Sequence, residues 1–171
     1  TLNYNTGFLG LNNTTPQSYE RIVVTGGVPV GGTTTNGSGV TNGGIVAPWI
    51  IDRLTHSFVG YNPTAADTGF QPLLSAAPGA GEIAYSDIVS GALTAGLLSG
   101  NDIADLTTAA KTLVDNPSLY ALRTNQNISP TASFNAITLT SGGLIMTGGT
   151  INPLGAVTAG AMAPMTLNFG S

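Results

Sequence analysis

The acidic side chains in the middle of the chain are the first candidates for chemistry. Two carboxyl groups held about 5–10 Å apart can cleave a glycosidic bond, one as the acid and the other as the base or nucleophile. The carboxylates of this region are Glu82, Asp87, Asp102, Asp105 and Asp115. The basic residues that would bind an acidic polysaccharide beside them, Arg53, Lys111 and Arg123, follow no matching spacing. We therefore predict that the protein is not an enzyme.

His56 is the only histidine of the sequence, so a histidine-based triad or metal site would depend on it alone. Asp52, four positions earlier, could orient the imidazole on a helix, and Ser57 follows as a candidate nucleophile. Pro48 and the β-branched residues at 50–51 disfavour a long helix, and Ser57 has no nucleophile elbow around it. We expect His56 to lie in a loop, where it could pair with Asp52.

Metal and cofactor sites are not expected either. The segment 101–105 could offer oxygen ligands to Ca²⁺, but it lacks the ligand spacing and the glycine of an EF-hand, and no glycine-aspartate nonapeptide repeat is present. The sequence contains no cysteine, which excludes thiolate ligands and disulfides. The glycines of 26–32 are not followed by a lysine that opens a helix, so they form no phosphate-binding loop.

The charge content excludes two classes of partner. Only 7% of the residues are charged, four of them are Lys or Arg, and the net charge is −4. Four basic residues cannot line a nucleic-acid backbone, and no polybasic run is present that could bind an anionic membrane surface. With 42% hydrophobic residues the chain can still fold, yet its longest weakly polar stretch, 89–98, is too short to insert through a membrane.

A short phrase recurs along the chain and predicts the elements that would position these residues. It consists of an apolar residue, Thr, at most one small residue, Gly-Gly and usually another apolar residue, and it occurs at 24–28, 40–45, 139–144 and 146–151. Each copy is typical of a strand end, a turn that tolerates positive φ, and the start of a new strand. The irregular spacing excludes a strict repeat code but fits irregular coils with loop insertions, and we expect 31–44 to be one such loop.

The segment 101–114 has two interpretations. Four apolar residues are spaced for one face of a short helix, with Asn101 as its cap and Pro117 beyond its end, namely Ile103, Leu106, Ala110 and Leu113. The same residues also fit two short threonine-rich strands.

The two ends of the sequence resemble each other. Residues 1–4 read Thr-Leu-Asn-Tyr and residues 166–169 read Thr-Leu-Asn-Phe. Either two β-coils simply look alike, or the chain is one unit of a longer array. Because no initiator Met or signal-peptide pattern opens the sequence, we expect a processed product or an excerpt of a longer protein, with 1–171 as a single module.

The order of several segments resembles the autotransporter-type β-strand-repeat surface proteins. A Gly-Gly-apolar run leads to Trp at 43–51, an aromatic-to-Tyr step follows at 57–61, and a short apolar segment closes the group at 69–73. The stretches 118–123 and 137–144 resemble the coils that come next in such proteins. The resemblance implies an all-β fold, a right-handed parallel β-helix (β-solenoid), in a protein exported to or beyond the bacterial cell surface as an adhesin, fibre or matrix component.

Four aromatic residues gather in the resembling segment, namely Trp49, Phe58, Tyr61 and Phe70. They could form a contact platform for a sugar or a neighbouring subunit, or they could fill part of the core.

The sequence as a whole favours an extracellular structural module of a fibre, filament or surface coat that self-associates by stacking β-coils. The alternative is an adhesin-type module that binds a glycan or a host surface.

Overall fold

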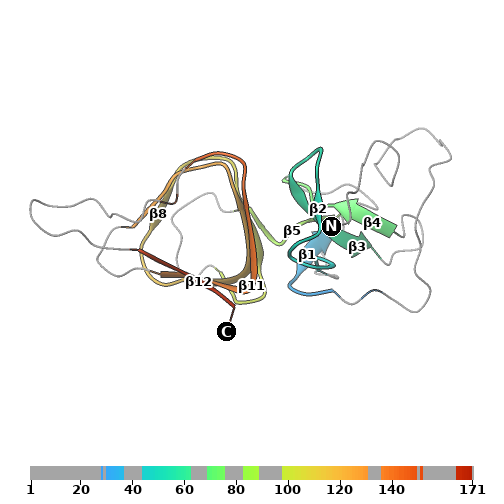
Figure 1. Cartoon of the computed structure of the whole chain (residues 1–171), viewed down its shortest axis with the longest axis horizontal. Helices are drawn as coiled ribbons and strands as arrows, with labels where there is room; N and C mark the ends of the chain where they lie inside the picture. The colour runs from blue at the N-terminus through green and yellow to red at the C-terminus, as the bar shows by residue number, and fades with distance from the viewer. Residues whose placement is uncertain are drawn as a thin grey trace, which may run out of the picture. The chain divides into compact units, whose positions relative to one another are not determined.

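A computed structural model describes residues 28, 30–36, 44–62, 69–75, 83–88, 98–130, 136–149, 151 and 165–170 (Figure 1). By internal contacts the chain divides into two compact units, Thr1–Ser86 and Asp87–Ser171. The strands of the first unit are β1 (Thr34–Asn36), β2 (Ile51–Asp52), β3 (Ser57–Asn62), β4 (Gly69–Pro72) and β5 (Ile83–Tyr85). Those of the second are β6 (Asp87–Ile88), β7 (Ile103–Leu106), β8 (Lys111–Leu113), β9 (Ser118–Thr124), β10 (Ile128–Pro130), β11 (Ala136–Met146) and β12 (Thr166–Phe169).

The named strand pairs of the first unit are antiparallel. Strands β2, β3 and β4 form one sheet in chain order, and β1 pairs with β5. Between β2 and β3 the chain reverses over Arg53–His56, with His56 in the left-handed region at φ 50°. A connection of this length can close an antiparallel pair, whereas a parallel pair requires a crossover of a dozen or more residues. Strand β1 also lies inside the segment 31–44, for which the composition had predicted a loop.

The core of the first unit lies between these strands. Its largest fully buried side chains include Tyr85, Phe58, Ile45 and Ile83. The Phe58 and Tyr85 rings meet edge to face, with 6.5 Å between their centroids. All three residues of β5 and residues 57–61 of β3 are buried, so these strands are covered on both faces.

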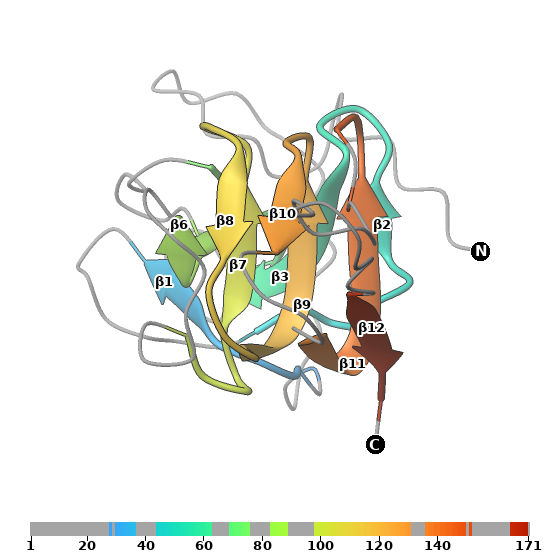
Figure 2. The same ribbon diagram turned by 90° about the vertical axis from the view of Figure 1, so that its left-hand side faces the viewer.

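The named strand pairs of the second unit are parallel. Its main sheet has the order β12-β11-β9-β7-β6, and β8 pairs separately with β10. Figure 2 shows β8 and β10 side by side, in front of β7 and β9. Leu113 of β8 and Ile128 of β10 belong to the same buried cluster as Leu106, Leu122 and Leu139 of the main sheet. Apolar side chains from both sheets thus form one core.

The glycine phrase at 139–144 has a different role from the predicted turn. Strand β11 continues through it, and the register of its pairing with β9 shifts between Leu139 and Gly143. Gly142 adopts φ +74° there, and the Ser141 hydroxyl donates a hydrogen bond to the Tyr120 carbonyl of β9 over 2.5 Å. The phrase therefore forms a β-bulge inside one strand, which also needs a residue that tolerates positive φ.

The prediction of a right-handed parallel β-helix was wrong. The described residues form several small sheets, and those of the first unit are antiparallel. The recurring apolar-Thr-Gly-Gly phrase behind the prediction fits turns between parallel strands and between antiparallel strands alike. The four-residue connection at 53–56 was the feature that required an antiparallel pair. That residues 1–171 form a single module stays a prediction.

The prediction of a short helix near 101–114 was also wrong. The segment contains β7 and β8, which agrees with the alternative interpretation of two short strands. Ile103 pairs with Ala121 and Leu106 pairs with Thr124 across the β7–β9 ladder. The helical spacing of the apolar residues was overridden by these non-local pairings, which bury all four residues of β7.

Candidate functional site

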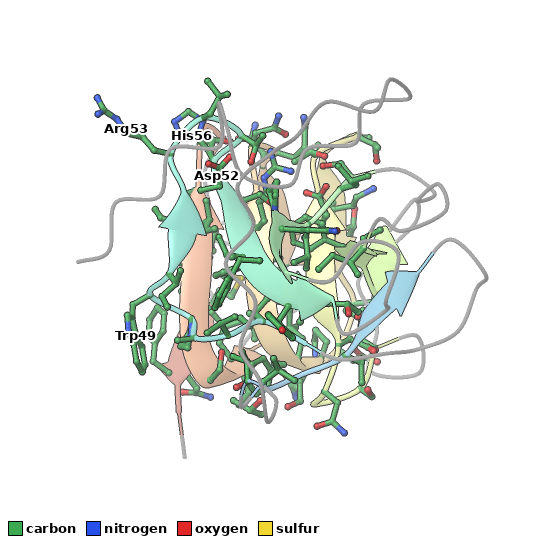
Figure 3. The ribbon with its side chains drawn as sticks, turned by 90° about the vertical axis from the view of Figure 1, so that its right-hand side faces the viewer. Trp49, Asp52, Arg53 and His56 are labelled. Carbon is green, nitrogen blue, oxygen red and sulfur yellow. The ribbon has the colours of Figure 1, made fainter. Side chains whose placement is uncertain are left out.

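The hairpin of β2 and β3 holds the three residues considered for a triad. Asp52 is buried, and its Oδ2 accepts hydrogen bonds from the Thr55 backbone N–H over 2.7 Å and from the Thr55 hydroxyl over 2.5 Å. His56 is exposed in the turn, and neither hydrogen bond of Asp52 involves it. Figure 3 shows Arg53 and His56 at the tip of this hairpin. The expected pairing of His56 with Asp52 is therefore not observed.

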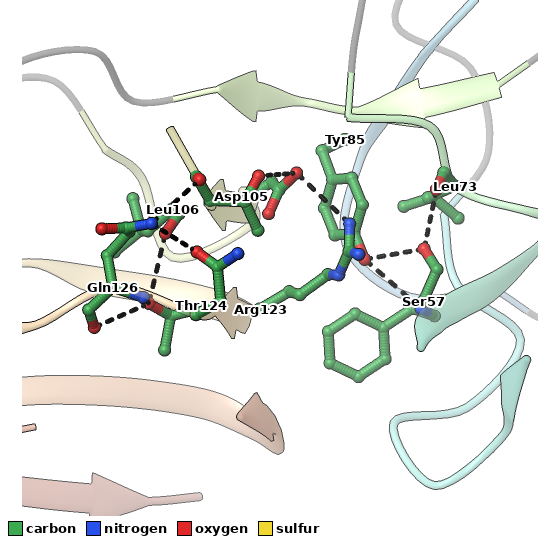
Figure 4. A network of polar contacts seen from close by, with 11 residues as sticks. Ser57, Leu73, Tyr85, Asp105, Leu106, Arg123, Thr124 and Gln126 are labelled. Carbon is green, nitrogen blue, oxygen red and sulfur yellow. Dashed lines mark hydrogen bonds and ion pairs between the residues drawn. The ribbon is translucent and has the colours of Figure 1, made fainter. Parts of the chain in front are cut away.

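Ser57 is turned away from solvent. Its hydroxyl donates to the Leu73 carbonyl over 2.7 Å and lies 2.8 Å from the Tyr85 hydroxyl (Figure 4). Because the one hydroxyl proton of Ser57 is committed to Leu73, the Tyr85 hydroxyl must donate to Ser57. These contacts join β3 and β5 inside the first unit and give Ser57 a structural role.

The acidic residues of the middle region serve different local structures. The Asp102 Oδ2 accepts a 2.7 Å hydrogen bond from the Ser99 backbone N–H and so closes the turn before β7. Asp105 forms an ion pair in the main sheet of the second unit, Asp87 contributes its backbone to β6, and Glu82 lies outside the described residues. Within the described part of the chain, no group of three or more His, Cys, Asp and Glu could hold a metal ion.

The ion pair between Asp105 and Arg123 links β7 to β9. The Arg123 Nη1 lies 3.4 Å from the Asp105 Oδ2, and the side chains are 15% and 0% exposed. The Thr107 hydroxyl also donates to this carboxylate over 3.1 Å, while the buried Asp105 Oδ1 has no hydrogen-bond partner in the part of the chain that the structure describes. The two residues face each other in the ladder register, so the pair is positioned by the sheet itself.

A second polar group lies where β9 ends. The Thr124 hydroxyl, fully buried, contacts the carbonyls of Leu106 and Gln126, both over 3.2 Å, and the Gln126 amide donates to the Thr107 carbonyl over 3.1 Å (Figure 4). These bonds satisfy backbone carbonyls at the ends of β7 and β9 that the strand pairing does not use. The group stabilises the fold and offers no reactive atom to solvent.

Lys111, one of the basic residues without a matching spacing in the sequence, is buried. Its side chain is only 3% exposed, and its Nζ has no hydrogen-bond partner among the described residues. In β8 it alternates with exposed Thr112 and points to the same side of the strand as Leu113 of the core. In a strand, Lys111 and Leu113 must point to the same side, and this was the sequence signal that Lys111 faces inward. The signal is easily missed because lysine side chains are mostly exposed.

The four candidate aromatic residues do not gather on one surface. Phe58 and Tyr61 are buried and Phe70 is half-buried, with the Tyr61 and Phe70 rings 5.3 Å apart. Trp49, in contrast, is 75% exposed. Three of the four thus contribute to packing, and Trp49 alone is available for contact with another molecule.

A β-turn displays Trp49. The Ile50 N–H donates to the Ala47 carbonyl over 3.1 Å, which places Pro48 and Trp49 at the two central positions of the turn. Proline favours the first central position because its ring fixes φ near −65°. Ile51 and Leu54, further along the hairpin, are also exposed. Figure 3 shows Trp49 well separated from Arg53 and His56.

Strand β12, at one end of the main sheet of the second unit, carries an exposed apolar residue in line with two core residues. In the parallel ladders Leu119 faces Leu139 and Leu139 faces Phe169, so the three side chains form one row across β9, β11 and β12. Leu119 and Leu139 are fully buried, whereas Phe169 is 57% exposed. Among the described strands none pairs with the other edge of β12. Within the described part of the chain, the apolar row therefore ends at β12.

Comparisons with protein-family models, with curated proteins and with solved structures found no match. Within the described residues, no helix has the length and apolar character needed to cross a membrane. The function proposed below therefore rests on the geometry of the described residues.

Proposed function

We propose that the chain is a structural module of an extracellular bacterial fibre, filament or surface coat, and that it self-associates through the edges of its sheets. The open edge of β12 carries the proposal. It combines backbone groups that no described strand pairs with and an apolar row that ends at exposed Phe169. Such an edge is a template for pairing with another chain, and natural sheets commonly protect it with lysine, proline or a bulge.

The sequence of β12 carries none of these protections. Its residues are Thr166, Leu167, Asn168 and Phe169, without a charge or a proline. With 7% charged residues in the whole chain, side-by-side association would bring few charges out of water. Both features support a surface that favours association of identical chains.

The proposal predicts concentration-dependent assembly that depends on β12. Purified chain is expected to form oligomers or filaments, measured by sedimentation velocity and by negative-stain electron microscopy. Leu167→Pro is expected to reduce assembly, because proline removes a backbone donor and disfavours pairing at the edge. Thr112→Pro, at an exposed position of β8, is the control for a general effect of proline on folding, with circular dichroism on both variants.

A chain that stays monomeric at every concentration tested would contradict the proposal. So would assembly that Leu167→Pro leaves unchanged while its circular dichroism matches that of the parent, because the edge of β12 would then take no part.

Trp49 supports a second candidate function, an adhesin-type module that binds a glycan. A tryptophan face packs well against the apolar face of a sugar ring, and the turn at 47–50 holds this side chain out in solvent. Trp49→Ala is expected to abolish binding on a glycan array while the circular dichroism spectrum stays the same. Leu54→Ala, which removes another exposed apolar side chain of the hairpin, is the matched control.

A further inference from the structure

We propose that residues Thr1–Tyr4 of a second copy of the chain add to β12 as the next parallel strand, with Leu2 beside Leu167 and Tyr4 beside Phe169. The inference rests on the proposed function, because it names the partner segment and its register. It starts from the match between Thr-Leu-Asn-Tyr at 1–4 and Thr-Leu-Asn-Phe in β12.

The pairing of β11 with β12 shows how such a strand would align. Ile137 faces Leu167 and Leu139 faces Phe169, so apolar positions two residues apart lie side by side in a parallel ladder. The segment 1–4 has apolar residues at the same two positions, Leu2 and Tyr4. A shift by one residue would bring Asn3 onto the apolar row, so the alternation selects the register.

The added strand would also cover what β12 leaves exposed. Tyr4 would extend the row of Leu119, Leu139 and Phe169, and the 57% exposed ring of Phe169 would become covered. Aromatic neighbours in facing positions stabilise a sheet. The backbone groups along the edge of β12 that no described strand covers would gain partners at the same time, as in other cases of β-strand addition.

The polar position between Leu167 and Phe169 also fits the added strand. Asn168 is exposed, and its amide lies 3.4 Å from the Thr138 hydroxyl of β11, so this position already makes a cross-strand contact. Asn3 would face Asn168, and stacked asparagines in parallel strands can form a hydrogen-bonded ladder.

The contact would join two different surfaces of the chain. An interface of this heterologous kind repeats from copy to copy and gives either a closed ring or an open filament. This consequence agrees with the fibre or coat proposed above.

Disulfide trapping tests the register directly, because the sequence contains no native cysteine. Chain with Asn3→Cys is mixed with chain with Asn168→Cys at a concentration at which the parent assembles, and the mixture is mildly oxidised. Facing residues of neighbouring strands lie about 5 Å apart at Cα, within the range that a disulfide spans. A disulfide-linked dimer on non-reducing gels is the expected result. Placing the cysteines on separate chains excludes a link within one chain.

An offset pair is the matched control. Asn3→Cys mixed with Thr166→Cys shifts one partner by two residues, which separates the Cα atoms by about 8 Å, beyond the reach of a disulfide. Both β12 positions are exposed, so neither substitution removes a core side chain. Leu2→Cys with Leu167→Cys provides a second in-register pair.

The outcomes separate this inference from the proposed function. Trapping of the in-register pairs with little trapping of the offset pair supports the inference. Assembly with equal trapping of both, or with none, overturns it and leaves the proposed function standing. Absence of assembly in the parent chain overturns both.

Discussion

The buried ammonium of Lys111 is an unusual feature at the scale of single residues. The described residues give this buried amino group no hydrogen-bond partner, and an amino group that loses its hydration without replacement costs free energy of folding. Its neighbours in the β8–β10 ladder and in the core, Ile128 and Leu113, offer no side-chain acceptor. Lys111 therefore lowers the stability of the fold that surrounds it.

Lys111→Met is accordingly expected to stabilise the protein. Methionine keeps the length of the side chain and removes the unsatisfied charge, so the free energy of unfolding should rise by about 1–3 kcal/mol. Urea denaturation followed by circular dichroism measures the change. Lys111→Arg, which keeps a charge and adds volume, should lower stability. A less stable Met variant would show that the ammonium has a stabilising role.

Gly149 combines a positive φ with a close approach to the backbone of another segment. It follows β11 with φ +71°, and a Cβ there would lie 2.4 Å from the carbonyl carbon and oxygen of Gln126. Gly149→Ala is expected to lower the free energy of unfolding by at least about 1–2 kcal/mol from the backbone conformation alone.

Gly148 provides the matched control for this prediction. A Cβ at Gly148 would have its nearest neighbour at 3.5 Å, an ordinary contact. Gly148→Ala should therefore change the unfolding free energy by less than about 0.5 kcal/mol. Equal effects of the two substitutions in the same urea titration would contradict the interpretation.

At the scale of elements, the pair Asp105–Arg123 couples β7 to β9 inside the parallel sheet. Removing one partner leaves the other charge buried without compensation, which commonly costs about 3–5 kcal/mol. Arg123→Met is therefore expected to destabilise the protein by this amount in urea denaturation.

A double variant tests whether charge is the cause. Asp105→Asn combined with Arg123→Met removes both charges and should recover most of the lost stability. If the double variant were as unstable as Arg123→Met alone, the loss would come from packing of the arginine side chain.

The direction of strand pairing is the other feature decided at this scale. Apolar residues alternate at Ile83 and Tyr85 and at Ile137 and Leu139, and these residues lie in β5 and β11. Parallel or antiparallel pairing depends on the length of the connection and on the partner strand. The hairpin at 53–56 could have been recognised from its length, whereas the pairing of β1 with β5 spans residues far apart in the sequence.

For the whole molecule, the low charge predicts how assembly responds to salt. Association through apolar and hydroxyl-bearing strands should change little between about 0.1 and 1 M NaCl, although the Debye length falls from about 10 to 3 Å. Sulfate should strengthen association, because it is excluded from protein surfaces. Sedimentation velocity across the salt series measures both effects. Dissociation at high NaCl would indicate that ion pairs hold the chains together.

The sequence by itself determined the strand-rich character of the chain, the small number of charges and the absence of a cysteine framework, because composition and local alternation carry these properties. Only the tertiary structure decided that the triad candidates Asp52, His56 and Ser57 point to different surroundings, and that Lys111 is buried. It also decided that Phe58 and Tyr61 enter the core while Trp49 faces solvent. The physical reason is that burial and hydrogen-bond partners depend on strand pairing between distant segments, which local sequence patterns do not specify.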